Sequence, residues 1–195
     1  MEQLILVDAD GGVIGFDSKD SCHQGMGKLH LAFSILIFTT DGQLLLQKRS
    51  SQKMLWPLYW SNSVCSHPRK GEDIEEAASR RIKEELGICC HVHYLYTFKY
   101  HASYFDIGSE SEICSVFFGI YDGPVFPEKL EVEQTKYVHF DCLADEIEKS
   151  PDSFTPWFKM EWDLILRQHM GQIKKFLGSF SNEPTTKKIS DSSFK

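Results

Sequence analysis

The sequence has no C-x-x-C pair and no basic stretch leading into an apolar one. Its six cysteines stand at positions 22, 65, 89, 90, 114 and 142. Residues 1–8 lack the basic region and the cleavage site of an export signal, and their pattern is typical of a strand. We therefore expect reduced thiols and a cytoplasmic protein, not a disulfide framework.

Long apolar runs and an excess of positive charge are also missing. No run approaches the about 20 residues of a membrane-spanning helix, which argues against a membrane partner. The net charge of −7 argues against a nucleic-acid partner. A phosphorylated substrate would therefore need a local cluster of basic side chains.

What the chain does have is the composition of an ordinary globular protein, with 42% hydrophobic and 25% charged residues. Its 195 residues are enough to bury one core. Residues 179–195 are polar and rich in Ser, Thr and Lys. We predict a single domain over residues 1–178, a loose C-terminal tail over residues 179–195, and a monomer or weak homodimer.

Hydrophobic periodicity predicts strands first, then a helix, further strands and a closing helix. Strands are expected at residues 3–7, 13–16, 31–38, 44–46, 92–100, 112–121 and 137–140. Helices are expected at residues 74–86, 143–149 and 156–177, and loops at residues 19–28 and 102–109. A hairpin is expected at Asp41 and Gly42. This order favours an α+β fold or an α/β/α sandwich.

The helix at residues 74–86 carries charge on its apolar face. Asp73 is its predicted N-cap, and Gly87 is its predicted left-handed end. At about 100° per residue, Arg81 and Glu85 fall inside the apolar stripe. A carboxylate on an inward face must be paired or bind a metal. The spacing leaves both open: an Arg81–Glu85 pair one turn apart, or a metal site.

The same segment resembles the Nudix box. The matching residues are Glu72, Arg80, Ile82, Glu84, Glu85, Gly87 and Ile88. Ser66 and Arg81 depart from the pattern, which argues against ordinary Nudix hydrolysis. The flanking residues 60–68, with Cys65-Ser-His67-Pro68, resemble type I isopentenyl-diphosphate isomerases. That resemblance implies a Nudix-type α/β/α sandwich with a mixed sheet and extra N-terminal strands.

Two pairs of possible metal ligands stand two residues apart, Cys65 with His67 and Glu110 with Glu112. In an extended chain the members of each pair point to one side. On spacing alone such histidines are more often ordinary surface or core residues. The resemblance to the isomerases implies one mixed imidazole and carboxylate site that holds Mn²⁺ or Zn²⁺. The ligands that it implies are His23, His30, His67, Glu110 and Glu112.

The isomerases move the double bond of isopentenyl diphosphate to give dimethylallyl diphosphate, in isoprenoid biosynthesis. The reaction needs an acid, a base and a group that stabilises a carbocation without attacking it. The resemblance implies proton transfer by Cys65 and Glu112, with help from Tyr100, and leaves open which of the first two is the acid. It implies that the ring of Trp157 stabilises the cation; the local pattern alone would favour core packing.

The resemblance also implies basic residues for the diphosphate, which are Lys19, Arg49 and Lys53, with further contacts from Ser66 and Arg81. Glu85 is the matching position for a Mg²⁺ that bridges the substrate phosphates. Two alternatives remain. The chain could be a Nudix hydrolase of a nucleoside diphosphate, or a catalytically silent Nudix module that only binds a metabolite or partner.

Overall fold

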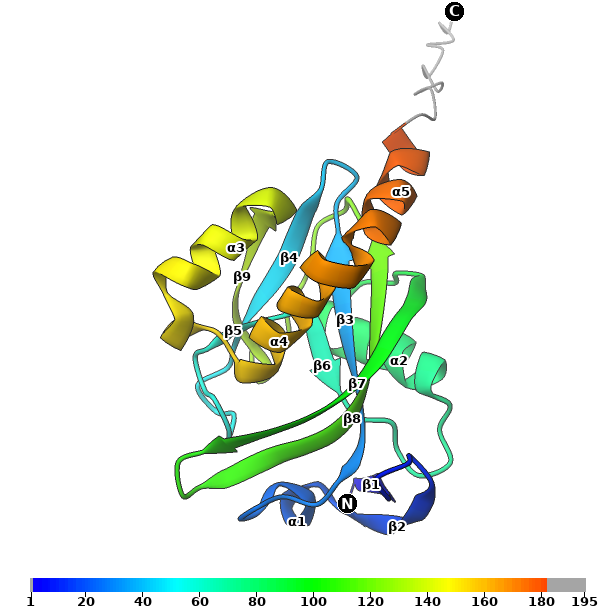
Figure 1. The fold of residues 1–195 in the computed structure, drawn as a ribbon, viewed down its shortest axis with the longest axis vertical. Helices are drawn as coiled ribbons and strands as arrows, with labels where there is room; N and C mark the ends of the chain where they lie inside the picture. Colours follow the sequence, from blue (N-terminus) through cyan, green and yellow to red (C-terminus); the bar gives the residue numbers. More distant parts are fainter. Residues whose placement is uncertain (1, 182–195) are drawn as a thin grey trace, which may run out of the picture.

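The computed structural model describes residues 2–181, which form a mixed sheet with helices on both faces (Figure 1). The strands are β1 Gln3–Val7, β2 Val13–Ser18, β3 His30–Phe38, β4 Gln43–Arg49, β5 Trp60–Ser61, β6 Val64–Ser66, β7 Val92–Tyr104, β8 Gly108–Ile120 and β9 Val132–His139. The helices are α1 Lys19–His23, α2 Ile74–Leu86, α3 Phe140–Lys149, α4 Pro156–Leu164 and α5 Met170–Ser181. The predicted α/β/α class is confirmed.

Strand β3 is the centre of the sheet. It runs parallel to β8 over its whole length and antiparallel to β6 on its other side. Its first residue pairs with β1, which carries β2 at the outer edge. Its last residue pairs with β4, which turns away to pair with β9 and β5. These neighbours bring segments from both halves of the chain to one strand.

The side chains of β3 alternate between two apolar layers, as the period of two in a strand requires. One layer holds Phe33, Ile35 and Ile37 with Ala78, Ile82 and Leu86 of α2. The other holds Ala32, Leu36 and Phe38 with Trp157, Phe158 and Trp162 of α4. Ser34 is the polar exception on the side of α4. The sheet therefore separates α2 from α4 and α5 (Figure 1).

Helix α2 begins and ends where the sequence predicts. The Asp73 carboxylate accepts a hydrogen bond of 2.8 Å from the backbone N–H of Glu75. At the other end, Gly87 has a φ of 67° and donates its N–H to the carbonyl of Lys83. A Cβ at Gly87 would lie 2.9 Å from the backbone oxygen of Phe126, so glycine is needed for both conformation and space.

Two predictions about elements are wrong. Residues 19–23, expected as loop, form α1, which Ser18 caps through a 3.3 Å bond from the N–H of Ser21. Residues 102–109 are mostly strand, because Ala102 is buried and pairs with Glu110. The predicted hairpin of β3 and β4 is present, but it is held by the single pair of Phe38 and Leu44, since β8 and β6 occupy the edges of β3.

The closing helix is longer and less regular than predicted. Residues Ile165–His169 form a π-helical stretch between α4 and α5, and α5 continues to Ser181 rather than ending near residue 177. Residues 182–195, most of the predicted tail, lie outside the described residues. Within the described part of the chain, no helix is both long and apolar enough to span a membrane.

Candidate active site

A cavity of about 240 Å³ opens between α1, the end of β4 and the start of α4. It is smaller than the roughly 300–1,000 Å³ of drug-sized sites, so it suits a small ligand. Its lining combines basic, thiol, imidazole, carboxylate and aromatic side chains. The lining includes Lys19, His23, Arg49, Lys53, Cys65, His67, Glu110, Glu112 and Trp157.

Three imidazoles meet at the inner end of the cavity. The Nδ1 atoms of His23 and His30 lie 2.7 Å from the backbone carbonyls of Lys19 and Lys28. A carbonyl only accepts, so each Nδ1 carries a proton, which leaves each Nε2 as the ring atom that can ligate a metal. The ring centroids of His23, His30 and His67 are 4.8–5.2 Å apart, and all three rings are buried.

Two carboxylates from β8 complete this group. Glu110 and Glu112 are two residues apart in the strand, so both point to the cavity side. The Nε2 of His23 lies 2.7 Å from Glu110, and the Nε2 of His67 lies 2.9 Å from Glu112. One ligand atom from each of the five residues lies within 4.8 Å of all the others.

These five side chains fit a divalent cation. The Nε2 atoms of His23 and His30 lie 2.7 Å and 3.4 Å from oxygens of Glu110 and Glu112, so imidazole nitrogens and carboxylates converge on one buried place, where a cation could be held by all of them. Among the described residues, the buried Nε2 of His30 has no hydrogen-bond partner. A set of three imidazoles and two carboxylates is typical of borderline ions such as Mn²⁺ and Zn²⁺. We call these five residues the His/Glu cluster.

The protonation states also suit metal binding. Burial lowers the pKa of His67 well below its usual value, and the neighbouring His30 and His23 lower it further. Burial alone would raise the pKa of Glu112, but its interaction with the nearby His30 and the hydrogen bond from Tyr100 outweigh burial and lower it. A neutral imidazole and an ionised carboxylate are the forms that ligate metals.

Cys65 lines the same cavity as Glu112. It lies in β6, directly opposite Ser34 of β3, and its side chain is partly buried. Burial raises the pKa of the Cys65 thiol well above its usual value, and the charge of Glu112 adds to the effect. The thiol therefore keeps its proton in this environment. Cys65 and Glu112 thus place two proton-transfer groups on the wall of one cavity.

Two aromatic residues lie beside these groups, and one of them, Trp157, lines the cavity. The hydroxyl of Tyr100 donates a 2.6 Å hydrogen bond to the second oxygen of Glu112. Burial raises the pKa of Tyr100, so the phenol remains protonated. Trp157, near the start of α4, is 1% exposed and packs edge-on against Trp56, with 5.2 Å between the ring centroids. The guanidinium carbon of Arg49 lies 5.2 Å from the ring centroid of Trp157.

Three of the predicted diphosphate-binding residues line the cavity, namely Lys19, Arg49 and Lys53. Arg49 is fixed by hydrogen bonds of 2.9–3.3 Å to the carbonyls of Leu55 and Trp56. Lys53 forms an ion pair with Glu131. These residues give the acidic protein the local positive region that a phosphorylated ligand requires.

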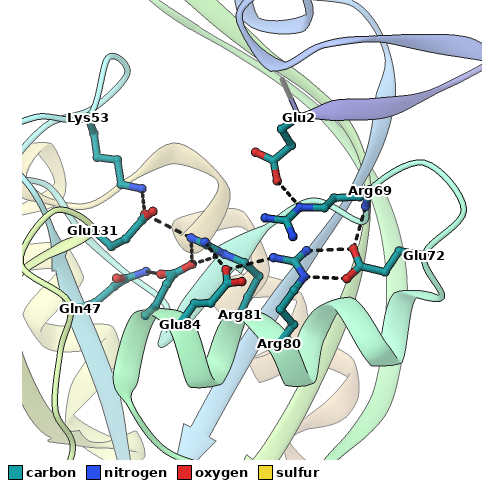
Figure 2. A network of polar contacts seen from close by, with 10 residues as sticks. Glu2, Gln47, Lys53, Arg69, Glu72, Arg80, Arg81, Glu84 and Glu131 are labelled. Carbon is teal, nitrogen blue, oxygen red and sulfur yellow. Dashed lines mark hydrogen bonds and ion pairs between the residues drawn. The ribbon is translucent and has the colours of Figure 1, made fainter.

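The remaining predicted residues, Ser66, Arg81 and Glu85, are not part of the cavity lining. Arg81 pairs with Glu85 at 2.7 Å, as the helical spacing allowed, and with Glu84 at 2.7 Å and Glu131 at 3.2 Å (Figure 2). The second oxygen of Glu85 lies 3.3 Å from the side-chain nitrogen of Gln47. Glu131 thus joins Arg81 to Lys53 at the edge of the cavity.

Sequence reasoning missed Glu131, Gln47 and a buried carboxyl on α4, Glu161. Glu131 stands in an irregular segment and carries no sequence signal. Glu161 does carry one, because it lies one helical turn after Trp157 on a face of apolar side chains. That is the same signal that singled out Glu85.

The comparisons with known proteins agree with this geometry. A model of the NUDIX domain matches residues 28–158. The chain is 38% identical to isopentenyl-diphosphate Delta-isomerase 1 of Photorhabdus laumondii over 175 residues, which cover 89% of this chain and 99% of that protein. It is 40% identical to the isopentenyl-diphosphate Delta-isomerase of Serratia proteamaculans over 157 residues, which cover 80% and 87%.

Solved structures give the same fold. A crystal structure from Deinococcus radiodurans has a TM-score of 0.69 and 22% sequence identity, and the match covers 86% of this chain and 99% of that one. A MutT protein from Methanosarcina mazei has a TM-score of 0.60 and 17% identity, over 72% and 94% of the two chains. At these identities the likeness bears on the fold alone.

Proposed function

The chain belongs to the NUDIX domain family, among its isopentenyl-diphosphate Delta-isomerases, and from that premise we propose how its cavity interconverts isopentenyl diphosphate and dimethylallyl diphosphate. One observation carries the proposal. The Cys65 thiol and the Glu112 carboxylate line a single small cavity, together with an indole and three basic side chains. Acid, base, cation stabiliser and anion site are thus present in one place.

The proposed reaction moves two protons. One group protonates the terminal alkene carbon, which leaves a tertiary carbocation at the adjacent carbon. The other group removes a proton from the carbon on the far side of the cation, and the new double bond forms there. Cys65 and Glu112 fill these roles, in either order, since the reaction runs in both directions. The Tyr100 hydroxyl donates its 2.6 Å hydrogen bond to Oε2 of Glu112 and so fixes the orientation of that carboxylate.

The His/Glu cluster would hold one Mn²⁺ or Zn²⁺. When bound, that ion supplies positive charge beside Glu112 and so favours its ionised form. His23, His30, His67 and Glu110 then act as ligands, and Glu112 both ligates and exchanges a proton. The five possible ligand atoms that converge in this buried cluster support the assignment.

Trp157 would stabilise the carbocation. An indole face attracts a desolvated cation by about 1–2 kcal/mol and offers no lone pair that could trap it. Trp56 packs against the edge of the ring and helps to exclude water. Exclusion of water matters because water would capture a tertiary cation as an alcohol.

The diphosphate would bind to Lys19, Arg49 and Lys53, with Ser66 and Arg81 as further contacts. Glu85 would hold a Mg²⁺ that also contacts the phosphate oxygens. In the structure Arg81 already neutralises Glu85, and Glu131 neutralises Lys53. Binding of the ion and the diphosphate would therefore exchange ion partners within this network (Figure 2). The proposal also includes that the protein is a monomer or weak homodimer and that it acts on this small substrate in the cytoplasm.

An NMR assay tests the proposed function. Purified protein with Mn²⁺ and Mg²⁺ is incubated with isopentenyl diphosphate, and the alkene signals and inorganic phosphate are followed together. We expect the signals of dimethylallyl diphosphate and no phosphate. Phosphate release without a new alkene would favour the hydrolase alternative. Binding without any reaction would favour a catalytically silent module.

A further inference from the structure

Glu161 is a fully buried carboxyl to which the reaction above gives no task. It lies on α4 one turn after Trp157, and its exposed fraction is 0%. Burial raises its pKa to about 8, and the hydrogen bond from Ser34 offsets only part of that shift. In the described part of the chain, its Oε1 has no hydrogen-bond partner. A buried carboxyl costs stability, so its position requires a reason.

A chain of hydrogen bonds joins Glu161 to Trp157. The indole Nε1 of Trp157 lies 3.4 Å from Oδ1 of Asn62. Nδ2 of Asn62 contacts Oγ of Ser34, and that hydroxyl lies 2.7 Å from Oε2 of Glu161. Both ends of the chain are on α4, whereas Ser34 is in the central strand β3 and Asn62 lies between β5 and β6.

The directions of the hydrogen bonds made by Asn62 are fixed by their partners. The indole N–H can only donate, so the Asn62 atom facing it is the oxygen. The other end of the Asn62 amide faces the carbonyl of Val64 at 3.0 Å, which can only accept, so that end is the NH₂ group. Asn62 therefore donates to the Ser34 hydroxyl. The Ser34 hydroxyl in turn donates its proton to Oε2 of Glu161.

All donors thus point one way, from the indole N–H to the carboxyl oxygen. Hydrogen bonds in such a series polarise one another, most strongly in a buried environment. An N–H that donates into the series leaves more electron density on the indole ring, whose face is the part that attracts a cation. The series also fixes α4 to the sheet at two points and so fixes the tilt of the ring.

We propose that Glu161 is a positioning residue for Trp157, whose carboxyl oxygen ends the hydrogen-bond series that orients the indole and strengthens its attraction for the cationic intermediate. This inference rests on the proposed function, because it assumes that Trp157 faces a cation. Glu161 itself is not part of the cavity lining and touches no reacting atom.

Binding of two diphosphates of nearly the same shape tests the proposal. One is 2-(dimethylamino)ethyl diphosphate, whose ammonium group carries a positive charge where the carbocation would form. The other is 3-methylbutyl diphosphate, which is saturated and neutral at that end. The ratio of their dissociation constants, measured by calorimetry, reports the attraction for the cation. A merely structural role for Glu161 would change both constants together and leave the ratio unchanged.

The variants are Glu161→Met, which keeps the volume and removes the acceptor, and Glu161→Gln, which keeps an acceptor for Ser34. We expect Glu161→Met to weaken ammonium binding by about three- to tenfold relative to the saturated compound. We expect Glu161→Gln to stay within about twofold of the parent ratio. Should Glu161→Met fail to fold, Ser34→Ala cuts the same series without altering α4, and we expect it to reproduce the loss.

A double-mutant cycle with Trp157→Phe separates this effect from a general disturbance. Phenylalanine keeps an aromatic face but has no N–H, so Glu161→Met should not change the ratio further in that background. An unchanged ratio in Glu161→Met, an equal loss in Glu161→Gln, or the same loss in the Trp157→Phe background would overturn the proposal. Isomerase turnover of the parent is measured first; its absence would instead count against the proposed function.

Discussion

Cys65 is the side chain whose removal should change turnover most while leaving the fold intact. Replacement by Ala removes one of the two proton-transfer groups, and we expect kcat to fall by about 10²- to 10⁴-fold. The measurement is the NMR rate together with the bound metal content. Cys90→Ala is the matched control, because Cys90 is also a partly buried thiol and does not line the cavity.

Metal content should be unchanged in both cysteine variants, since a thiol is not part of the His/Glu cluster. Full activity in Cys65→Ala would contradict the assignment of Cys65 to proton transfer. A loss of bound metal in that variant would instead place the thiol among the ligands.

Glu161 should also make stability depend on pH. Its pKa is about 8 in the folded protein, whereas an unfolded glutamate has a pKa of about 4.3. Between these values the folded state keeps a proton that the unfolded state has lost, so stability falls as pH rises through this range. The upper limit is about 1.4 kcal/mol per pH unit.

Urea unfolding at pH 5, 6.5 and 8 of the parent and of Glu161→Gln checks this expectation. The glutamine does not titrate, so the difference in unfolding free energy between the two proteins should shift steadily in favour of Glu161→Gln as the pH rises. A difference that stays constant across the three pH values would show that Glu161 is already ionised at pH 5.

At the scale of elements, Gly87 ends α2 in a conformation that only glycine adopts without strain. Its φ is 67°, and an added Cβ would lie 2.9 Å from the Cβ and the carbonyl oxygen of Phe126. We expect Gly87→Ala to lower the unfolding free energy by roughly 1–3 kcal/mol. Urea unfolding at constant metal concentration measures it.

Gly171 offers the contrasting control. It lies within α5, is exposed, and has no atom near the position of an added Cβ in the described structure. Gly171→Ala should therefore raise the unfolding free energy by up to about 1 kcal/mol, the helix propensity difference. Equal effects at the two glycines would contradict the different roles assigned to them.

The elements that the sequence predicted well are those in which periodicity and end signals agree. Residues 74–86 carry an apolar stripe, Asp73 before it and Gly87 after it, and α2 has these bounds. Residues 102–109 lack such agreement, since their polar side chains hide a buried alternation around Ala102. The hairpin at Asp41 and Gly42 is confirmed, although partners distant in sequence take most of both edges of β3.

The residues of the site also divide into those that the sequence identified and those that it missed. The residues of the His/Glu cluster could be named from the resemblance to the isomerases, which rests on short motifs such as Cys65-Ser-His67-Pro68, whereas their spacing alone favoured ordinary histidines. Glu131 could not, because its role depends on the distant residues Lys53 and Arg81. Glu161 depends on Ser34, 127 residues away in sequence. Long-range polar partners leave no periodic trace in a single sequence.

At the scale of the whole molecule, metal binding should stabilise the fold. The cluster joins α1, β3, β8 and the residue after β6, so an ion bound there links segments from His23 to Glu112. At a free Mn²⁺ or Zn²⁺ concentration 100 times the dissociation constant, the gain is about 2.7 kcal/mol. A rise in Tm of several degrees on adding the ion to chelator-treated protein measures it.

His67→Ala removes a ligand and should abolish most of that rise. His101→Ala is the matched control, since His101 is an exposed histidine outside the cluster. An equal rise in Tm for both variants would place the stabilising ion elsewhere.

The most direct test of proton transfer by Cys65 and Glu112 follows the transferred hydrogen itself. Isopentenyl diphosphate is converted in D₂O, and the dimethylallyl diphosphate is examined by NMR. Transfer through exchangeable groups such as Cys65 and Glu112 predicts one deuterium in the new methyl group early in the conversion, before the reverse reaction adds more, and a deuterated product that forms far more slowly with Cys65→Ala or Glu112→Gln. Product free of deuterium would mean that hydrogen moves within the substrate, and the two-residue account would be contradicted.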